Sequence, residues 1–165
     1  MRVLTYTLLV AALALSPMEI IAQENAKPSV KNADMTVQMT SQQELIDLFI
    51  TAAKTGNQEV IGEFLKHGFP VDVRNSAGYT ALMMAAYYGH QNIVTTLIKY
   101  GADACARDLK GNTAIMGAMF KLEWSIVKQL RQVDCDTNAN VTGQKTLTEF
   151  AKIIGQDAKL KALTE

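Results

Sequence analysis

The side chains that could carry out catalysis do not form a recognisable arrangement in this 165-residue chain. The sequence has no serine in a nucleophile-elbow motif, no glycine-rich phosphate-binding loop and no Cys/His cluster at zinc-ligand spacing. Its recurring aspartates fall in predicted turns, where a short carboxylate stabilises the backbone; these are Asp72, Asp103, Asp108 and Asp136. We therefore predict that the protein is not an enzyme.

Methionine is the next side chain with chemistry of its own. Met83 and Met84 are adjacent, and Met116 and Met119 are three residues apart. Clustered thioethers can bind a soft metal ion, but at helical spacing methionine far more often fills gaps between packed helices. We expect these four residues to lie in the core, and we expect neither a metal ion nor a cofactor.

A period of 33 residues organises the rest of the chain. Small residues recur at this interval, namely Ala52, Ala85, Ala118 and Ala151. Threonines do the same, namely Thr80, Thr113 and Thr146. A fixed period of this length is typical of stacked units, each of which buries its apolar face only against its neighbours.

The clearest unit spans residues 75–107. Its landmarks, in chain order, are Gly78-Tyr79-Thr80-Ala81-Leu82, Ala85-Ala86, Gly89-His90 and Gly101-Ala102-Asp103. Gly78 suits a turn, Thr80 can cap a helix and Gly89 can end one. This unit resembles an ankyrin repeat, a helix–turn–helix element of the same length and pattern.

The resemblance implies an all-α ankyrin-repeat solenoid in which short hairpin loops join the units, within a domain at residues 41–165. We place its repeats at about 42–74, 75–107, 108–140 and 141–163. Ser41 and Glu44 have capping-box spacing, so the first helix is expected to begin there. Leu122 replaces the glycine between the helices of the third unit, so that turn costs about 1 kcal/mol or takes another shape.

The N-terminus has the pattern of a secretory signal peptide. Arg2 precedes an apolar stretch over residues 3–15, and Pro17 and a small residue, Ala22, follow. Cleavage after Ala22 fits this pattern, giving a signal peptide over residues 1–22. An uncleaved membrane anchor needs about 20 apolar residues, which this run does not reach without interruption. Residues 23–40 are polar without an apolar period, and we interpret them as a flexible leader.

Ankyrin repeats bind their partners through the hairpin tips and the exposed edges of the first helices. The resemblance carries this role over to Arg74, Ser76, Ala77, Tyr79, Tyr87, Tyr88, Arg107, Leu109, Lys110, Asn112, Phe120 and Lys121. We expect the four aromatic residues of this set to share one concave surface, edged by the two arginines. Tyrosine and arginine dominate binding energy at interfaces. The alternative is that some of these rings pack between repeats.

The two cysteines, Cys105 and Cys135, fall in the loops of consecutive units. An even count in an exported chain favours a disulfide. Their positions within the repeat differ by three residues, and packed helices lie about 10 Å apart, whereas a disulfide needs Cα atoms within about 7 Å. The register therefore argues against the bond, and the sequence leaves the pairing open.

Basic and acidic residues number 16 each and cancel, so no global field attracts nucleic acid or, after signal cleavage, a membrane surface. The chain resembles small ankyrin proteins of the Gram-negative periplasm. That likeness implies a monomeric module that binds a protein partner, either supporting an oxidative-stress enzyme such as catalase or neutralising a toxin as an immunity protein. The alternatives are a haem carrier using Tyr79, Tyr87 or Tyr88 as ligand, and a secreted effector.

Overall fold

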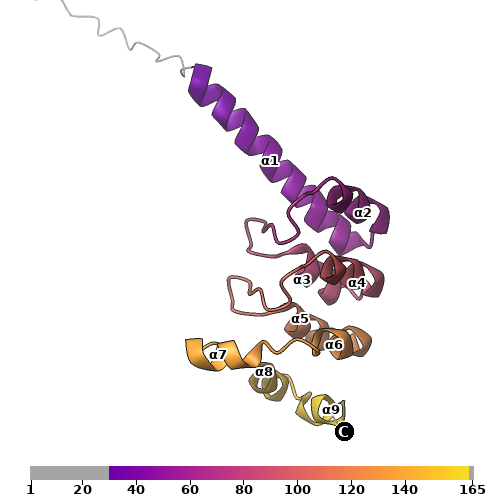
Figure 1. Cartoon of the computed structure of the whole chain (residues 1–165). Coiled ribbons are helices and arrows are strands. Elements are labelled where there is room, and N and C mark those ends of the chain that lie inside the picture. Colours follow the sequence, from indigo (N-terminus) through magenta and orange to yellow (C-terminus); the bar gives the residue numbers. More distant parts are fainter. Residues whose placement is uncertain (1–29, 164–165) are drawn as a thin grey trace, which may run out of the picture.

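The computed structural model describes residues 30–163, and every regular element in that range is an α-helix (Figure 1). The elements are α1 (Val30–Thr55), α2 (Gln58–Lys66), α3 (Ala81–Tyr87), α4 (Gln91–Lys99), α5 (Ala114–Phe120), α6 (Trp124–Leu130), α7 (Asp136–Thr142), α8 (Leu147–Ile153) and α9 (Asp157–Ala162). The all-α fold predicted from the sequence is confirmed. Among these helices, none combines the length and the apolar composition that a membrane crossing requires. The predicted signal peptide and residues 23–29 of the predicted leader lie outside the described residues.

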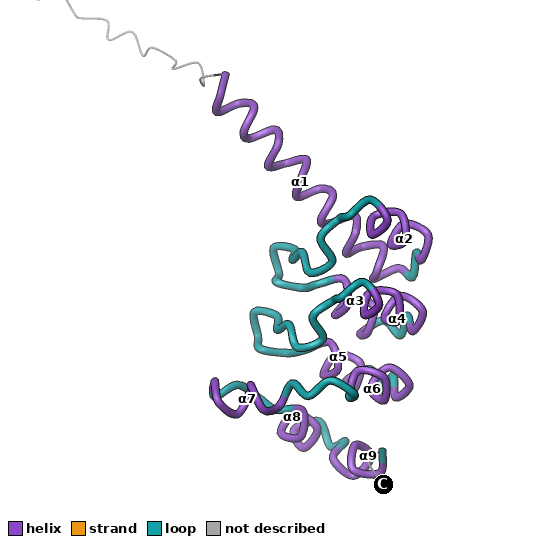
Figure 2. Tube along the Cα trace, in the orientation of Figure 1, coloured by secondary structure: helices purple, strands orange, loops and turns teal. Residues whose placement is uncertain are grey.

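The helices are arranged in pairs that stack in one direction to form a solenoid (Figure 1). One row contains α1, α3, α5 and α8, each packed against the next. The second row contains α2, α4 and α6, each packed against its partner in the first row and against its neighbour. Figure 2 shows that the loops between α2 and α3 and between α4 and α5 project from the same side of this stack.

The alanines that keep the 33-residue period lie where the first-row helices meet. Ala85, Ala118 and Ala151 are completely buried, and Ala52 is nearly so. Their small side chains allow neighbouring helices to approach closely. Larger apolar side chains from both rows fill the space between the helices, and each contributes about 1.5–3 kcal/mol on full burial. The period is therefore a packing requirement of the stack.

Two of the three repeated threonines cap helices of the first row. Thr80 Oγ1 accepts a hydrogen bond from the backbone N–H of Met83 at 3.3 Å, which caps α3. Thr146 and Glu149 form a complete capping box at the start of α8, as their spacing predicts. Thr113 occupies the same place before α5, but its buried hydroxyl has no hydrogen-bond partner in the described part of the chain.

The turns between paired helices require a left-handed residue. Gly56 and Gly89 supply it with φ values of +80° and +78°. Leu122 occupies the equivalent position in the third unit with φ +63°. The turn therefore keeps the shape it has in the other units, and Leu122 adopts a left-handed conformation that is unfavourable for a residue with a Cβ.

Two parts of the fold differ from the expectations. α1 begins at Val30, so Ser41 lies inside a helix and residues 30–40 of the predicted leader are helical. A capping residue starts a helix only where the residues before it are not helical. Neither Gly nor Pro occurs between Val30 and Ser41 to interrupt a helix there. The second difference is α7, a short helix where a third hairpin was expected, which spans the boundary predicted between residues 140 and 141.

Candidate functional site

An open cleft of about 530 Å³ lies against α3, α5 and α8. Its lining residues are Tyr79, Met83, Met84, Tyr87, Tyr88, Asp108, Lys110, Asn112, Met116, Gly117, Phe120 and Phe150. We call it the aromatic cleft. The structure thus brings together all four aromatic residues that the sequence placed on one surface. It adds a fifth ring, Phe150, from the last unit.

The rings of the aromatic cleft contact one another. Tyr87 and Phe120 are one 33-residue period apart and stack at 6.3 Å between ring centroids, with 14° between their planes. Tyr88 meets Tyr87 edge-on at 5.1 Å. Both geometries are favourable for aromatic pairs. The solenoid places equivalent residues of successive units one above the other, so the stacking follows from the repeat itself.

The depth of burial separates the floor of the cleft from its rim. Met83 and Met116 are buried and form the floor. Tyr88 and Phe120 are 43% and 57% exposed and form the rim. Met83, Met116 and Met119 therefore lie in the core, as predicted, whereas Met84 is only partly buried. Met83 and Met116 also provide a soft and adaptable base for the cleft.

Lysine side chains surround these rings. Lys110 lines the cleft directly, and Nζ of Lys121 lies 5.3 Å from the centroid of the Tyr87 ring. Both residues belong to the set predicted from the sequence. An ammonium group at this distance is attracted by the negative face of the ring.

The hairpin tips are held by side-chain hydrogen bonds at equivalent positions. Asn75 Oδ1 accepts from the backbone N–H groups of Ala77 and Tyr79. Asp108 Oδ1, 33 residues later, accepts from the backbone N–H groups of Lys110 and Asn112. These contacts pre-organise both loops. The predicted residues Ser76, Ala77 and Leu109 lie exposed at the tips outside the aromatic cleft, and the Asn112 amide donates to Asp108.

A family profile described as ankyrin repeats (3 copies) matches the chain over residues 18–108 and again over residues 48–142. Together the two matches cover well over half of the sequence. The chain belongs to the ankyrin-repeat family. A comparison with curated proteins gave no match.

Two residues predicted to edge the binding surface have a structural task within the ankyrin stack. Arg74 Nη1 donates to the carbonyl oxygens of Gly78 and Arg107. Arg107 Nη1 donates to those of Gly111, at 2.6 Å, and Lys145, at 3.1 Å. Neither arginine lines the aromatic cleft. Each guanidinium closes its own hairpin and reaches the next repeat, so both arginines contribute to repeat stacking, while their predicted contact with a partner stays a prediction.

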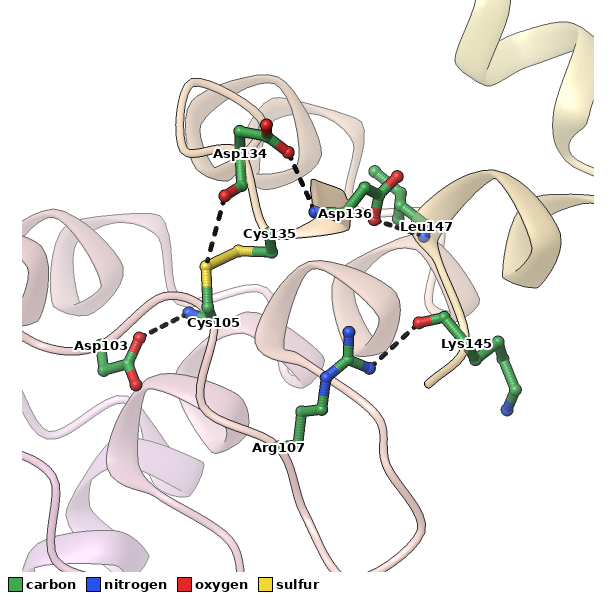
Figure 3. The surroundings of a disulfide bond; sticks show 8 residues. All are labelled: Asp103, Cys105, Arg107, Asp134, Cys135, Asp136, Lys145 and Leu147. Atoms are coloured by element: carbon green, nitrogen blue, oxygen red, sulfur yellow. Dashed lines mark hydrogen bonds between the residues drawn. A yellow bond between two sulfur atoms is a disulfide. The ribbon is translucent and has the colours of Figure 1, made fainter. Parts of the chain in front are cut away.

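Cys105 and Cys135 form a disulfide bond, with their Cα atoms 5.3 Å apart (Figure 3). The argument from register against this bond was therefore wrong. The separation of about 10 Å applies to packed helices, whereas Cys105 lies in a loop between ankyrin repeats. After α6 the chain does not form another hairpin, and residues 131–135 bring Cys135 to that loop.

The disulfide lies beside contacts that join the last two repeats. Asp136 follows Cys135 in the chain (Figure 3). Its Oδ1 accepts a hydrogen bond from the backbone N–H of Leu147 at 2.8 Å. Asp103 Oδ1 accepts from the backbone N–H of Cys105 at the same distance. Asp103 thus acts in a turn, as the sequence predicted, whereas Asp136 is the first residue of α7 and joins that helix to the start of α8. The Cys105–Cys135 bond and these hydrogen bonds together position the start of α8.

The two histidines make contacts to backbone carbonyl groups, His67 at the end of α2 and His90 between repeats. A ring nitrogen of His90 lies 2.9 Å from the carbonyl oxygen of Lys54, and the ring packs on Gly56, where an added Cβ would come within 2.8 Å of it. Within the described residues, no group of three or more His, Cys, Asp or Glu side chains could hold a metal ion.

Sequence reasoning left several residues of the aromatic cleft and its surroundings out of the binding set, among them Met84, Phe150 and Lys145. Met84 and Phe150 line the cleft, and Lys145 lies over the Phe150 ring at 5.5 Å. The helical spacing of Met84 and Tyr88 was a usable signal for the first. No local signal pointed to Phe150 or Lys145, because the unit that carries them was interpreted as a cap.

Proposed function

We propose that the protein binds a protein partner through the aromatic cleft and acts in the periplasm. The observation that carries the proposal is the pair of stacked rings at the rim, Tyr87 and Phe120, with Tyr88 beside them. Phe120 and Tyr88 are about half exposed although buried apolar methionines lie directly below them.

The clustering of these rings distinguishes them from ordinary exposed apolar residues. A single exposed ring, such as Tyr100 at the end of α4, is common on soluble proteins. A contiguous apolar patch marks an interaction site much more often. Aromatic residues packed together at the centre of an interface also supply most of its binding energy.

A binding role agrees with the family and with the chemistry of the aromatic cleft. Ankyrin repeats generally form non-catalytic interaction modules. The acidic group lining the cleft, Asp108, has its carboxylate oxygens engaged by hydrogen bonds within its own hairpin. It is therefore needed for the loop conformation, and its geometry does not suggest a general base.

The proposed location is supported by the disulfide and by the signal-peptide pattern. Disulfides persist in oxidising compartments such as the periplasm and are rare in the cytosol. Expression of the full-length chain in a Gram-negative host tests the location. We expect the protein in the periplasmic fraction, with a mass that corresponds to residues 23–165 without free thiols. An uncleaved chain in the cytosol would contradict this part of the proposal.

The resemblance to small exported ankyrin proteins suggests two kinds of partner. One is a periplasmic enzyme of oxidative-stress defence, such as catalase, and the other is a toxin that the protein neutralises. Affinity capture from periplasmic extract, followed by mass spectrometry of the retained proteins, distinguishes between them.

The role of the aromatic cleft is tested with Tyr88→Ala and Phe120→Ala in one variant. We expect it to lose the captured partner, since removal of anchoring rings costs about 2 kcal/mol or more in binding. Its melting temperature should change little because both side chains are largely exposed. Tyr100→Ala is the matched control: it also removes a half-exposed ring, but away from the cleft. Equal capture of the partner by the parent protein, the double variant and the Tyr100→Ala control would refute the proposed site.

A further inference from the structure

Four lysines gather around the aromatic cleft. Lys110 lines it. The other three lie over rings of the lining residues, with Nζ-to-centroid distances of 5.6 Å for Lys54 and Tyr88, 5.3 Å for Lys121 and Tyr87, and 5.5 Å for Lys145 and Phe150. They come from three of the four repeats, so the fold and not a local charge run brings them together.

The charge of these lysines is not balanced by neighbouring acids. Within residues 30–163, none of the four forms an ion pair. Asp108 is the acidic residue among those lining the cleft, and its oxygens accept hydrogen bonds from the backbone N–H groups of Lys110 and Asn112 and from the Asn112 amide. The cleft lining therefore supplies one carboxylate against the four lysines that line it or lie over its rings. In a chain whose formal net charge is zero, this excess is a local property of the cleft.

The lysines also determine whether a cationic or an anionic ligand group can bind beside the aromatic rings. Open aromatic faces attract cations such as quaternary ammonium groups. Here the ring faces of Tyr87, Tyr88 and Phe150 already have ammonium groups over them. A further cation would be repelled by those charges, whereas a carboxylate would be attracted to them.

We propose that the aromatic cleft recognises an acidic segment of the partner that carries an aromatic or large aliphatic side chain between its carboxylates. The apolar side chain enters the cleft above Met83 and Met116, and the carboxylates meet the lysines at the rim. This inference rests on the proposed function and specifies the chemistry of its partner. The cleft volume of about 530 Å³ is within the range of sites that enclose a ligand group, about 300–1,000 Å³.

The test uses the full-length protein purified after export and a display library of random peptides of about 12 residues, which are long enough to cross the cleft when extended. We expect the selected peptides to be enriched in Asp and Glu around an aromatic residue or leucine. For a selected peptide carrying a fluorophore, Lys110→Glu with Lys121→Glu should weaken binding about tenfold or more, because two attractions become repulsions. Lys99→Glu with Lys128→Glu makes the same charge change on α4 and α6 and should leave binding unchanged.

The outcomes separate this inference from the proposed function. If Tyr88→Ala with Phe120→Ala abolishes peptide binding but the selected peptides are neutral or basic, the cleft is the binding site and the acidic preference is refuted. If acidic peptides bind this aromatic variant with the same affinity as the parent protein, the proposed binding site and the acidic preference of the cleft are both refuted. Binding to vesicles of anionic phospholipid through the same lysines, with no acidic peptides selected, would also overturn the inference, since a lipid surface would then be the ligand.

Discussion

Arg74 and Arg107 are joined across a repeat boundary, because the guanidinium of the first donates a hydrogen bond to the carbonyl oxygen of the second. Arg107 repeats the contact by donating to the carbonyl oxygen of Lys145. The two residues are one 33-residue period apart, and each also closes its own hairpin. A chain of hydrogen bonds from arginine side chains to backbone carbonyl groups therefore runs along the loop side of the solenoid.

The contribution of this chain can be measured at Arg107, which is half-buried. We expect Arg107→Ala to reduce the free energy of unfolding by about 2 kcal/mol, because two carbonyl groups lose a charged donor. Chemical denaturation provides the measurement. Arg107→Lys should recover only part of the loss, since an ammonium group lacks the planar fork of the guanidinium. An alanine variant as stable as the parent protein would show that water replaces these bonds without cost.

The Cys105–Cys135 bond should stabilise the protein by restricting the unfolded chain. The two residues are 30 positions apart, and closing a loop of that length is expected to contribute about 3.6 kcal/mol. Cys105→Ser with Cys135→Ser should lower the free energy of unfolding by this amount. A reductant should lower the stability of the parent protein and leave that of the double variant unchanged. Two free thiols in the exported protein, counted by alkylation and mass spectrometry, would contradict the pairing.

Two of the repeated threonines, Thr80 and Thr113, should contribute differently to the stability of the protein. Thr80→Val should cost about 1 kcal/mol because α3 loses its cap. Thr113→Val should cost much less or stabilise the protein, since the buried hydroxyl it removes has no partner among the described residues. Thermal unfolding of the two variants measures the difference. Similar losses for both would show that the Thr113 hydroxyl is satisfied in solution.

Leu122 offers a route to a more stable protein. Its side chain is 55% exposed and its backbone is left-handed, a conformation that costs a residue with a Cβ about 1 kcal/mol. Leu122→Gly should therefore be more stable than Leu122→Ala by about 1 kcal/mol, because both remove the side chain but only glycine relieves the backbone. At an ordinary helical or turn position the order would be reversed. That reversed order at residue 122 would exclude strain in this turn.

The capping box of α8 should make the stability of the protein depend on pH in acid. Hydrogen bonds from the backbone N–H and the hydroxyl of Thr146 lower the pKa of Glu149. A lowered folded-state pKa stabilises the protein above the unfolded carboxyl pKa of about 4.3, and this contribution is lost as the pH falls through the lower folded value. Glu149→Gln should therefore flatten the stability profile in this acidic range. Superimposable profiles for the two proteins would show that the box does not form.

The sequence by itself determined the architecture, because the features that specify a repeat are local. Each unit needs a small residue where helices meet, a threonine before a helix and a glycine between helices. Each of these residues acts on the few residues around it, so their period of 33 residues can be recognised from the sequence alone. It also placed Tyr87 and Phe120 together, since residues one period apart are neighbours in any stack.

Tertiary structure decided what depends on the path of the loops and on the ends of the stack. The Cys105–Cys135 bond exists because α7 replaces a hairpin, which brings two positions of different register together. Arg74 and Arg107 became stacking residues because carbonyl groups of the next repeat lie within their reach. Lys54, Lys121 and Lys145 form one basic rim because different elements of the fold place them over neighbouring rings of the cleft. The arginine contacts follow the 33-residue period, but the disulfide and the basic rim do not, and all three required the folded loops to be in place.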